Sequence, residues 1–172
     1  MPWYGSHSYL SEYIRKNNCR RILEIGVYTG ENAESMVETA IEYAAVPQEV
    51  DYYGFDFFWN SSSDRVARKL EKLGCTFELY EGDTLETLPL AAASLPKMDL
   101  IFIDGGKSLR EAMSDWQHSE PLLHDKTGVF VHNADFTGVR RMLDQVSRDR
   151  YQVEVFRAPS EGRVALIRRR RD

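Results

Sequence analysis

The sequence predicts an α/β fold in which a mostly parallel sheet carries helices on both faces. Segments with strand chemistry alternate with segments of helical periodicity, and the run MDLIFID at 98–104 is almost wholly apolar, as in a strand buried on both faces. Repeated strand–helix units require parallel strands joined by right-handed crossovers. The end of the chain differs, because two alternating runs flank APSEG at 158–162 and predict an antiparallel hairpin.

The elements are expected in a regular order. A strand at 21–27 precedes a helix at 31–45, whose small and apolar side chains share one face. A strand at 51–58 precedes a helix at 61–74 that begins with serine caps and ends at Gly74. The remaining strands are expected at 75–82, 98–104 and 128–133, and the remaining helices at 8–18, 108–123 and 137–149.

The terminal hairpin is expected to pair residues 151–157 with residues 163–168 at the edge of the sheet. The alternation of apolar and polar residues predicts which side chains face the core. These are Val153, Val155, Val164 and Leu166, or their immediate neighbours.

Composition limits the class of protein. The chain has 172 residues, of which 42% are apolar and 28% charged, so a single domain over residues 1–172 is expected. No membrane-spanning run or secretory signal is evident, and two cysteines, Cys19 and Cys75, are too few for a disulfide framework. A cytoplasmic protein with free thiols is therefore predicted. The net charge of −5 argues against nucleic-acid binding, apart from the run RRRRD at 168–172.

Two glycines mark the turn after the first strand of the sheet. In RILEIGVYTGENAE, Gly26 and Gly30 permit a sharp turn, and the helix beginning near Glu31 directs free N–H groups at the same place. The spacing is ExGxxxG and not GxGxxG, and Asp56 follows Gly26 by 30 residues instead of about 20. Glu31 would also repel a diphosphate. A ligand with a zwitterionic end, a ribose and an adenine is predicted in preference to a dinucleotide.

Several motifs at the ends of consecutive strands resemble those of the class I S-adenosylmethionine-dependent methyltransferases. ILEIGVYTGENA resembles their glycine-rich first motif, and YGFD and EGD resemble the ends of their second and third strands. DLIFIDGGK and GVFVHNAD resemble the fourth and fifth strands of the small O-methyltransferases, the catechol-type and methyltransferase-24-like group. The resemblance implies a single-domain Rossmann-like fold with a seven-stranded, mostly parallel sheet, and S-adenosylmethionine as the cofactor.

The resemblance also implies positions for the cofactor. The backbone around Gly26 and Gly30 should face its methionine portion, with Tyr28 over that portion and Glu24 anchoring the turn. Asp56, a carboxylate that ends an apolar strand, should accept both ribose hydroxyls.

The adenine is expected one strand farther along. Phe57 should pack on its face, although core packing explains this residue equally well. The residues expected at the adenine edge are Gly82, Asp83 and Thr84, and Asp104 is expected where the cofactor meets the acceptor.

The chemistry is expected after the fourth strand. Lys107 occupies the position of the lysine that acts as base in the catechol-type enzymes, three residues after Asp104. Related small methyltransferases often have histidine at this position, so Lys107 is a substitution relative to them. His132, at the end of the fifth strand, is the alternative base. Of the four histidines, only His132 is expected to touch a substrate.

The metal site of the family is incomplete in this sequence. Asp104 is its secure carboxylate, Asn133 takes the next position, Ala134 offers no side-chain ligand, and Asp135 lies one residue beyond. Magnesium prefers an oxygen-rich set of ligands. We therefore expect a weakly held divalent cation or none.

The leading hypothesis is O-methylation of a small-molecule acceptor. The tetrad typical of amine methylation is missing, and neither cysteine lies where carbon methylation would need a nucleophile. The alternatives are a catalytically inactive cofactor-binding partner and, less favoured by the acidic chain, an RNA methyltransferase. The acceptor pocket is expected to use the N-terminal segment, the loop at 133–138, and a second subunit if the protein is a homodimer. Trp3 and Tyr4 either cover this pocket or pack against the first helix.

Overall fold

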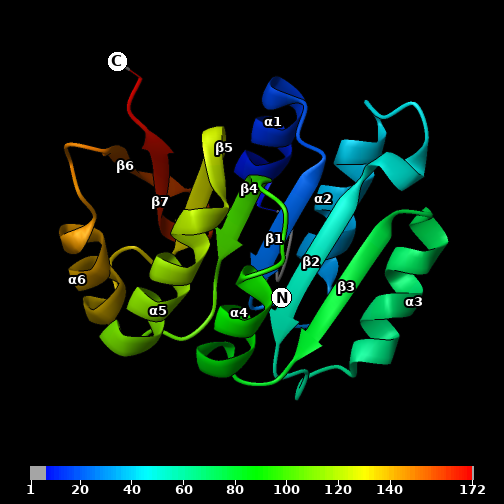
Figure 1. The fold of residues 1–172 in the computed structure, drawn as a ribbon, viewed down its shortest axis with the longest axis horizontal. Coiled ribbons are helices and arrows are strands. Elements are labelled where there is room, and N and C mark those ends of the chain that lie inside the picture. The colour runs from blue at the N-terminus through cyan, green and yellow to red at the C-terminus, as the bar shows by residue number, and fades with distance from the viewer. Residues whose placement is uncertain (1–6, 172) are drawn as a thin grey trace.

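Within residues 7–171, the part of the chain that the structure describes, seven strands form one sheet (Figure 1). The strand order in this computed structural model is β3-β2-β1-β4-β5-β7-β6. The first five strands pair in parallel, whereas β7 pairs antiparallel with both β5 and β6. The predicted fold is confirmed. The strands are β1 Arg21–Ile25, β2 Asp51–Asp56, β3 Thr76–Glu81, β4 Met98–Ile103, β5 Leu123–His132, β6 Tyr151–Ala158 and β7 Gly162–Arg169.

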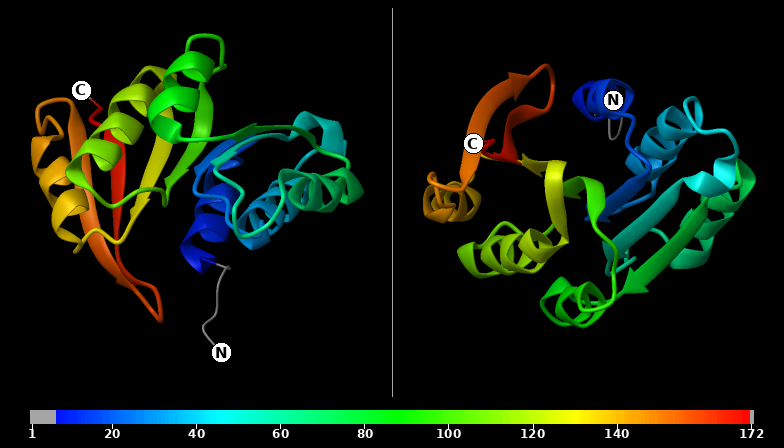
Figure 2. Two further views of the ribbon diagram at one scale, coloured as in Figure 1. Left: turned by 90° about the horizontal axis from the view of Figure 1, so that it is seen from below. Right: turned by 45° about the horizontal axis from the view of Figure 1, so that its top comes forward.

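Helices cover both faces of the sheet (Figure 2). One hydrophobic cluster joins α1, α2 and α3 to one face, and a second joins α4, α5 and α6 to the other. Alternate residues of β4 enter the two clusters, which explains its almost continuous apolar sequence. The helices are α1 Ser8–Asn17, α2 Glu31–Ile41, α3 Ser63–Leu73, α4 Thr84–Ala92, α5 Leu109–Ser119 and α6 Thr137–Gln145, with short 3-10 turns at Pro47–Glu49 and Glu120–Leu122.

Helix α4 was not predicted from the sequence. Pro89 lies inside it and removes one backbone N–H, so the segment has a weak helical signal. The Asp83 side chain caps the helix by accepting a hydrogen bond from the Leu85 N–H at 2.9 Å. This cap fixes residues 82–84 at the end of β3, where the adenine was expected.

The terminal hairpin is confirmed, with Ala158 paired to Gly162 across its turn. Val164 and Leu166 are buried, as predicted. Val155 is 50% exposed, so its assignment to the core is wrong. The physical reason is that β6 is the outermost strand, and its side chains have fewer elements to pack against.

The topology separates the two ends of the sheet. Because β1 to β5 are parallel, their carboxyl ends lie at one edge of the sheet, toward the bottom of Figure 1. The strand order reverses between β1 and β4, and the switch point lies at this edge. Strand β7 runs the other way, so the arginine run ends at the opposite edge. There Arg168 pairs with Glu154 at 2.9 Å and Arg169 with Asp125 at 3.3 Å. This basic segment therefore does not border the expected cofactor site.

Two further expectations concern cysteines and membranes. Cys19 and Cys75 are both buried free thiols. Between residues 7 and 171, no helix has the length and apolar character needed to cross a bilayer.

Candidate active site

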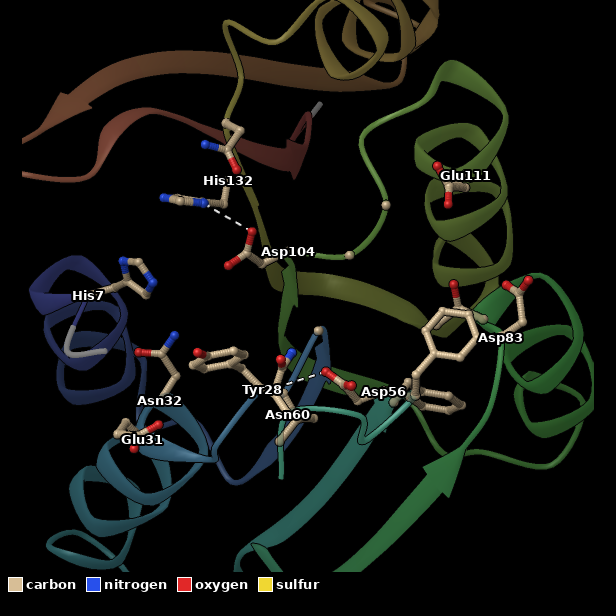
Figure 3. A pocket seen from close by; sticks show the side chains of 18 of the residues that line it. His7, Tyr28, Glu31, Asn32, Asp56, Asn60, Asp83, Asp104, Glu111 and His132 are labelled. Atoms are coloured by element: carbon tan, nitrogen blue, oxygen red, sulfur yellow. Dashed lines mark hydrogen bonds and ion pairs between the residues drawn. The ribbon is translucent and has the colours of Figure 1, made fainter. Parts of the chain in front are cut away.

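A cavity of about 700 Å³ opens at the carboxyl ends of the parallel strands (Figure 3). Its size is typical of a site for a cofactor together with a small ligand. Residues following β1, β2, β3, β4 and β5 all reach it, as the switch-point rule predicts. The expected residues that line it are Gly26, Tyr28, Asp56, Phe57, Gly82, Asp83, Thr84, Asp104, His132 and Asn133.

Gly26 holds the backbone where β1 meets β4. Its N–H donates to the Phe55 carbonyl at 2.8 Å, while the Asp104 N–H donates to the Ile25 carbonyl at 2.8 Å. With φ at +89°, a Cβ at Gly26 would stand 2.2 Å from the Asp104 carbonyl oxygen. Only glycine fits this crossing, which forms a cradle beside the cavity.

Gly30 and Glu24 act on the turn from behind the cavity. Gly30 is the N-cap residue of α2 at φ +87°, and a Cβ there would face the Val66 side chain at 3.2 Å. Glu24 is fully buried and accepts a short hydrogen bond from the Tyr52 hydroxyl. Burial raises the pKa of Glu24 well above its usual value, although the hydrogen bond opposes this. Neither residue lines the cavity, and both act on the turn that does.

Asp56 organises the loops that follow β1 and β2. Its Oδ2 accepts from the Tyr28 N–H at 2.9 Å, and its Oδ1 accepts from the Phe58 N–H at 2.7 Å. Tyr28 and Phe58 have φ values of +56° and +58°, so these bonds hold two uncommon backbone conformations. Each carboxylate oxygen keeps a second lone pair for a hydroxyl donor.

The adenine end of the cavity has an aromatic side. The Phe57 ring stacks on Trp59 with centroids 4.2 Å apart, and the two side chains are 37% and 82% exposed. Phe57 therefore packs outside the core, on the cavity wall. The capping residue Asp83 lies on the same side, near Asp56 in Figure 3, and Thr84 follows it in the lining.

Asp104 is the centre of a charged cluster at the other end. Its Oδ1 accepts from Lys107 Nζ at 2.7 Å and from His132 Nδ1 at 3.0 Å. Burial would raise the pKa of Asp104, but the His132 hydrogen bond and the Lys107 charge hold it below its usual value. Lys107 does not line the cavity.

His132 donates from both ring nitrogens. Nδ1 faces the Asp104 carboxylate, and Nε2 lies 3.0 Å from the Glu161 carbonyl oxygen, which can only accept. Burial would lower the pKa of His132, but the bond and charge of Asp104 raise it above its usual value. The structure thus favours the imidazolium form, which has no free lone pair.

The metal candidates do not converge. Asn133 lines the cavity with Asp104, whereas Asp135 lines a separate cavity of about 490 Å³ beside α6. Over residues 7–171 there is no group of three or more His, Cys, Asp or Glu residues placed to hold a metal ion. Asp135, which was expected as a ligand, thus does not line the same cavity as Asp104.

Sequence reasoning missed two walls of the cavity. His7, at the N-cap of α1, and Ser160 and Glu161, in the hairpin turn, all line it. Substrate contact was expected of His132 alone among the histidines, but His7 lines the same cavity. Topology contained the signal, since a strand antiparallel to β7 runs parallel to β5 and must end at the cavity edge. Trp3 and Tyr4 lie outside the described residues.

The electrostatics of the lining are acidic. Among the described residues it holds six carboxylates and no lysine or arginine; the carboxylates are Glu31, Asp56, Asp83, Asp104, Glu111 and Glu161. Such a lining attracts a cationic ligand and repels a diphosphate. The cradle at Gly26, the carboxylate at Asp56 and this acidic lining together fit S-adenosylmethionine, which carries a sulfonium and an ammonium group.

Comparison with known proteins assigns the class. Residues 23–134 match a family model described as a methyltransferase domain, the methyltransferase-24 family. The match covers most of the chain, so the protein belongs to this methyltransferase family. The suspected resemblance to the small O-methyltransferases is thereby confirmed. A search of curated protein sequences finds no match.

Solved structures share the fold at low sequence identity. An O-methyltransferase from Bacillus cereus in complex with SAH has a TM-score of 0.77 and 16% identity, over 95% of this chain and 80% of its own. TomG, a Streptomyces achromogenes O-methyltransferase of tomaymycin synthesis in complex with SAM, has a TM-score of 0.73 and 18% identity, over 95% and 78%. The SAH-bound Podospora anserina methyltransferase PaMTH1 has a TM-score of 0.69 and 20% identity, over 98% and 80%.

Proposed function

We propose that the protein transfers a methyl group from S-adenosylmethionine to an oxygen of a small molecule. The acidic cavity at the switch point is the observation that carries this proposal. It combines a glycine cradle, a strand-end carboxylate and a polar far end in one cavity. Membership of the methyltransferase family and the cofactor-bound relatives with this fold support the same conclusion.

The residues that line the cavity support an assignment of the parts of the cofactor. Tyr28 and the Gly26 backbone would hold the methionine portion, Asp56 the ribose hydroxyls, and Phe57 with residues 82–84 the adenine. S-adenosylmethionine supplies a methyl group on a positively charged sulfur, and its loss leaves a neutral thioether. The acidic lining favours the charged form in the cavity and interacts less with the neutral product.

The acceptor would occupy the end formed by His7, Asn32, His132, Asn133 and Ser160. These side chains are polar, and Asn32 Oδ1 is buried with no hydrogen-bond partner among the described residues. A buried acceptor atom without a partner gains from a hydroxyl donor. A hydroxylated small molecule therefore fits this end better than an extended apolar ligand. Orientation of its oxygen is the main catalytic task for an in-line transfer.

Calorimetric titration tests the proposal without an acceptor. We expect S-adenosylhomocysteine to bind with micromolar affinity and NAD not to bind, because its diphosphate would meet the carboxylates. Asp56→Ala should weaken binding by roughly 30-fold or more, equivalent to about 2 kcal/mol for charge-assisted hydrogen bonds.

The matched control is Asp51→Ala, which removes a carboxylate from the opposite end of the same strand. It should leave the affinity unchanged. Because Asp56 also holds the Tyr28 and Phe58 N–H groups, the unfolding midpoint of each variant is measured alongside. Equal affinity of S-adenosylhomocysteine for wild type and a folded Asp56→Ala would refute the ribose assignment.

A further inference from the structure

A second histidine in the cavity is paired with a carboxylate. His7 Nδ1 makes a short contact with Glu161 Oε2, which joins the N-cap of α1 to the β6–β7 turn. The His7 side chain is only 8% exposed. Its ring packs edge-on against Phe102 and lies tilted to His132, with centroids 5.1 Å away in both cases. These contacts from three elements fix the ring at the cavity wall.

The pairing determines which nitrogen of His7 can accept a proton. A carboxylate accepts hydrogen bonds and does not donate them when ionised, so Nδ1 carries the hydrogen that faces Glu161. No group within residues 7–171 hydrogen bonds to Nε2. His7 lines the cavity, on the same wall as His132 and Asp104 in Figure 3. The free lone pair of a neutral His7 is therefore on Nε2.

The other two base candidates are less well placed. Lys107 donates to Asp104 at 2.7 Å and does not line the cavity. His132 faces acceptors with both nitrogens, the Asp104 carboxylate and the Glu161 carbonyl, so neither nitrogen offers a free lone pair. Both side chains hold Asp104, and His132 also holds the hairpin turn. A general base must reach the acceptor with a free lone pair, and His7 does this better than either of them.

We propose that His7, oriented by Glu161, is the general base that removes the proton from the acceptor hydroxyl. This inference rests on the proposed methyltransferase function. The O–H bond of the acceptor breaks and its proton moves to Nε2. The acceptor oxygen forms the new bond to the methyl carbon while the carbon–sulfur bond breaks, and the electron pair of that bond stays on the sulfur as a neutral thioether. The imidazolium that results lies against the Glu161 carboxylate and returns its proton to water after product release.

The charges around His7 are compatible with this role. Glu161 faces it from the hairpin turn, His132 from β5, and Tyr9 from α1 with ring centroids 5.3 Å apart. Burial raises the pKa of Tyr9 far above its usual value, so this phenol stays neutral. Asp104 and Lys107 form an ion pair behind His132. The carboxylate in direct contact offsets the repulsion from His132.

The first test needs no acceptor. In the nitrogen-15 NMR spectrum of the free protein, neutral His7 should carry its proton on Nδ1. In Glu161→Ala it should shift to the Nε2–H form that an unpartnered histidine favours. Glu154→Ala, which removes a carboxylate from the same hairpin but away from His7, should leave the His7 tautomer unchanged. A proton on Nε2 of His7 in the wild type would overturn the proposal.

The second test is methyl transfer to a panel of catechol, phenol and methyl glucoside, followed as S-adenosylhomocysteine formation. His7→Asn keeps a good helix N-cap residue, so the fold should persist. It should lower the turnover number by roughly 100-fold or more. His124→Asn is the control, since His124 also pairs with a carboxylate, Asp99 at 2.8 Å, but outside the cavity. Its turnover should match wild type.

The two proposals fail in different ways. If S-adenosylhomocysteine does not bind the wild type, the methyltransferase function itself is wrong. If it binds equally to wild type and His7→Asn, and both turn over an acceptor at the same rate, only the role of His7 is wrong. If nothing in the panel is methylated, a proton on Nε2 of wild-type His7 would still overturn the role of His7 as the base.

Discussion

Asp115 gives a quantitative prediction about stability. It lies on α5 with 0% of its surface exposed, and neither carboxyl oxygen has a hydrogen-bond partner among the described residues. Burial raises the pKa of Asp115 to about 7, and the nearby Thr84 hydroxyl only partly opposes this. The ordinary value is 3.8, and each pKa unit corresponds to about 1.4 kcal/mol, so ionisation in the folded state costs roughly 4 kcal/mol.

The sign follows from proton linkage. Above pH 3.8 the unfolded chain loses the Asp115 proton while the folded protein keeps it, so stability falls as pH rises until the folded group also ionises near pH 7. Asp115→Asn removes this dependence. Its free energy of unfolding, relative to wild type, should therefore increase by about 3 kcal/mol between pH 5 and pH 8.

Urea unfolding of wild type and Asp115→Asn at several pH values measures this difference directly. Subtracting the two curves cancels the other titrating groups. Asp144→Asn, which removes an exposed carboxylate on α6, is the control for the same substitution at the surface. A difference for Asp115→Asn that does not change with pH would contradict a buried Asp115 that keeps its proton in the folded state. The effect also bears on the site, since a Cβ on the cavity residue Gly105 would stand 3.0 Å from Asp115 Oδ2.

Two further substitutions test the support of the glycine turn. Gly26→Ala should lower the unfolding midpoint strongly and abolish cofactor binding, because its methyl group would overlap the Asp104 backbone; Gly162→Ala, at φ +76° with open space around it, should cost only about 1–2 kcal/mol. Tyr52→Phe should destabilise the protein by about 1–3 kcal/mol in urea unfolding, since it leaves the buried Glu24 carboxyl without its partner. Wild-type stability of either Gly26→Ala or Tyr52→Phe would contradict the packing described for the turn.

Much of the fold could be predicted because its signals are local. Each parallel strand ends at, or just before, a polar or glycine residue that can be recognised in the sequence. The apolar sequence of Met98–Ile103 directly predicts a central strand. Helix α4 escaped prediction because Pro89 interrupts its pattern. Val155 escaped because alternation identifies the two faces of a strand but not how far each face is covered.

The cofactor end of the site was predictable for the same reason, whereas the acceptor end was not. Asp56 and Asp104 terminate strands, so their place at the switch point follows from strand order. The His7–Glu161 pair joins residues 154 positions apart, and only the folded hairpin brings them together. The donor role of His132 likewise depends on the Glu161 carbonyl, which no motif encodes.

A crystal structure with S-adenosylhomocysteine is the most direct test that the cavity at the strand ends binds the cofactor. We expect adenine beside Phe57 and Asp83, and both ribose hydroxyls donating to Asp56. The sulfur should face the end of the cavity formed by His7 and Asp104. Additional density next to the sulfur would locate the acceptor. A ligand bound outside this cavity, or one whose ribose makes no contact with Asp56, would contradict the assignment of the site.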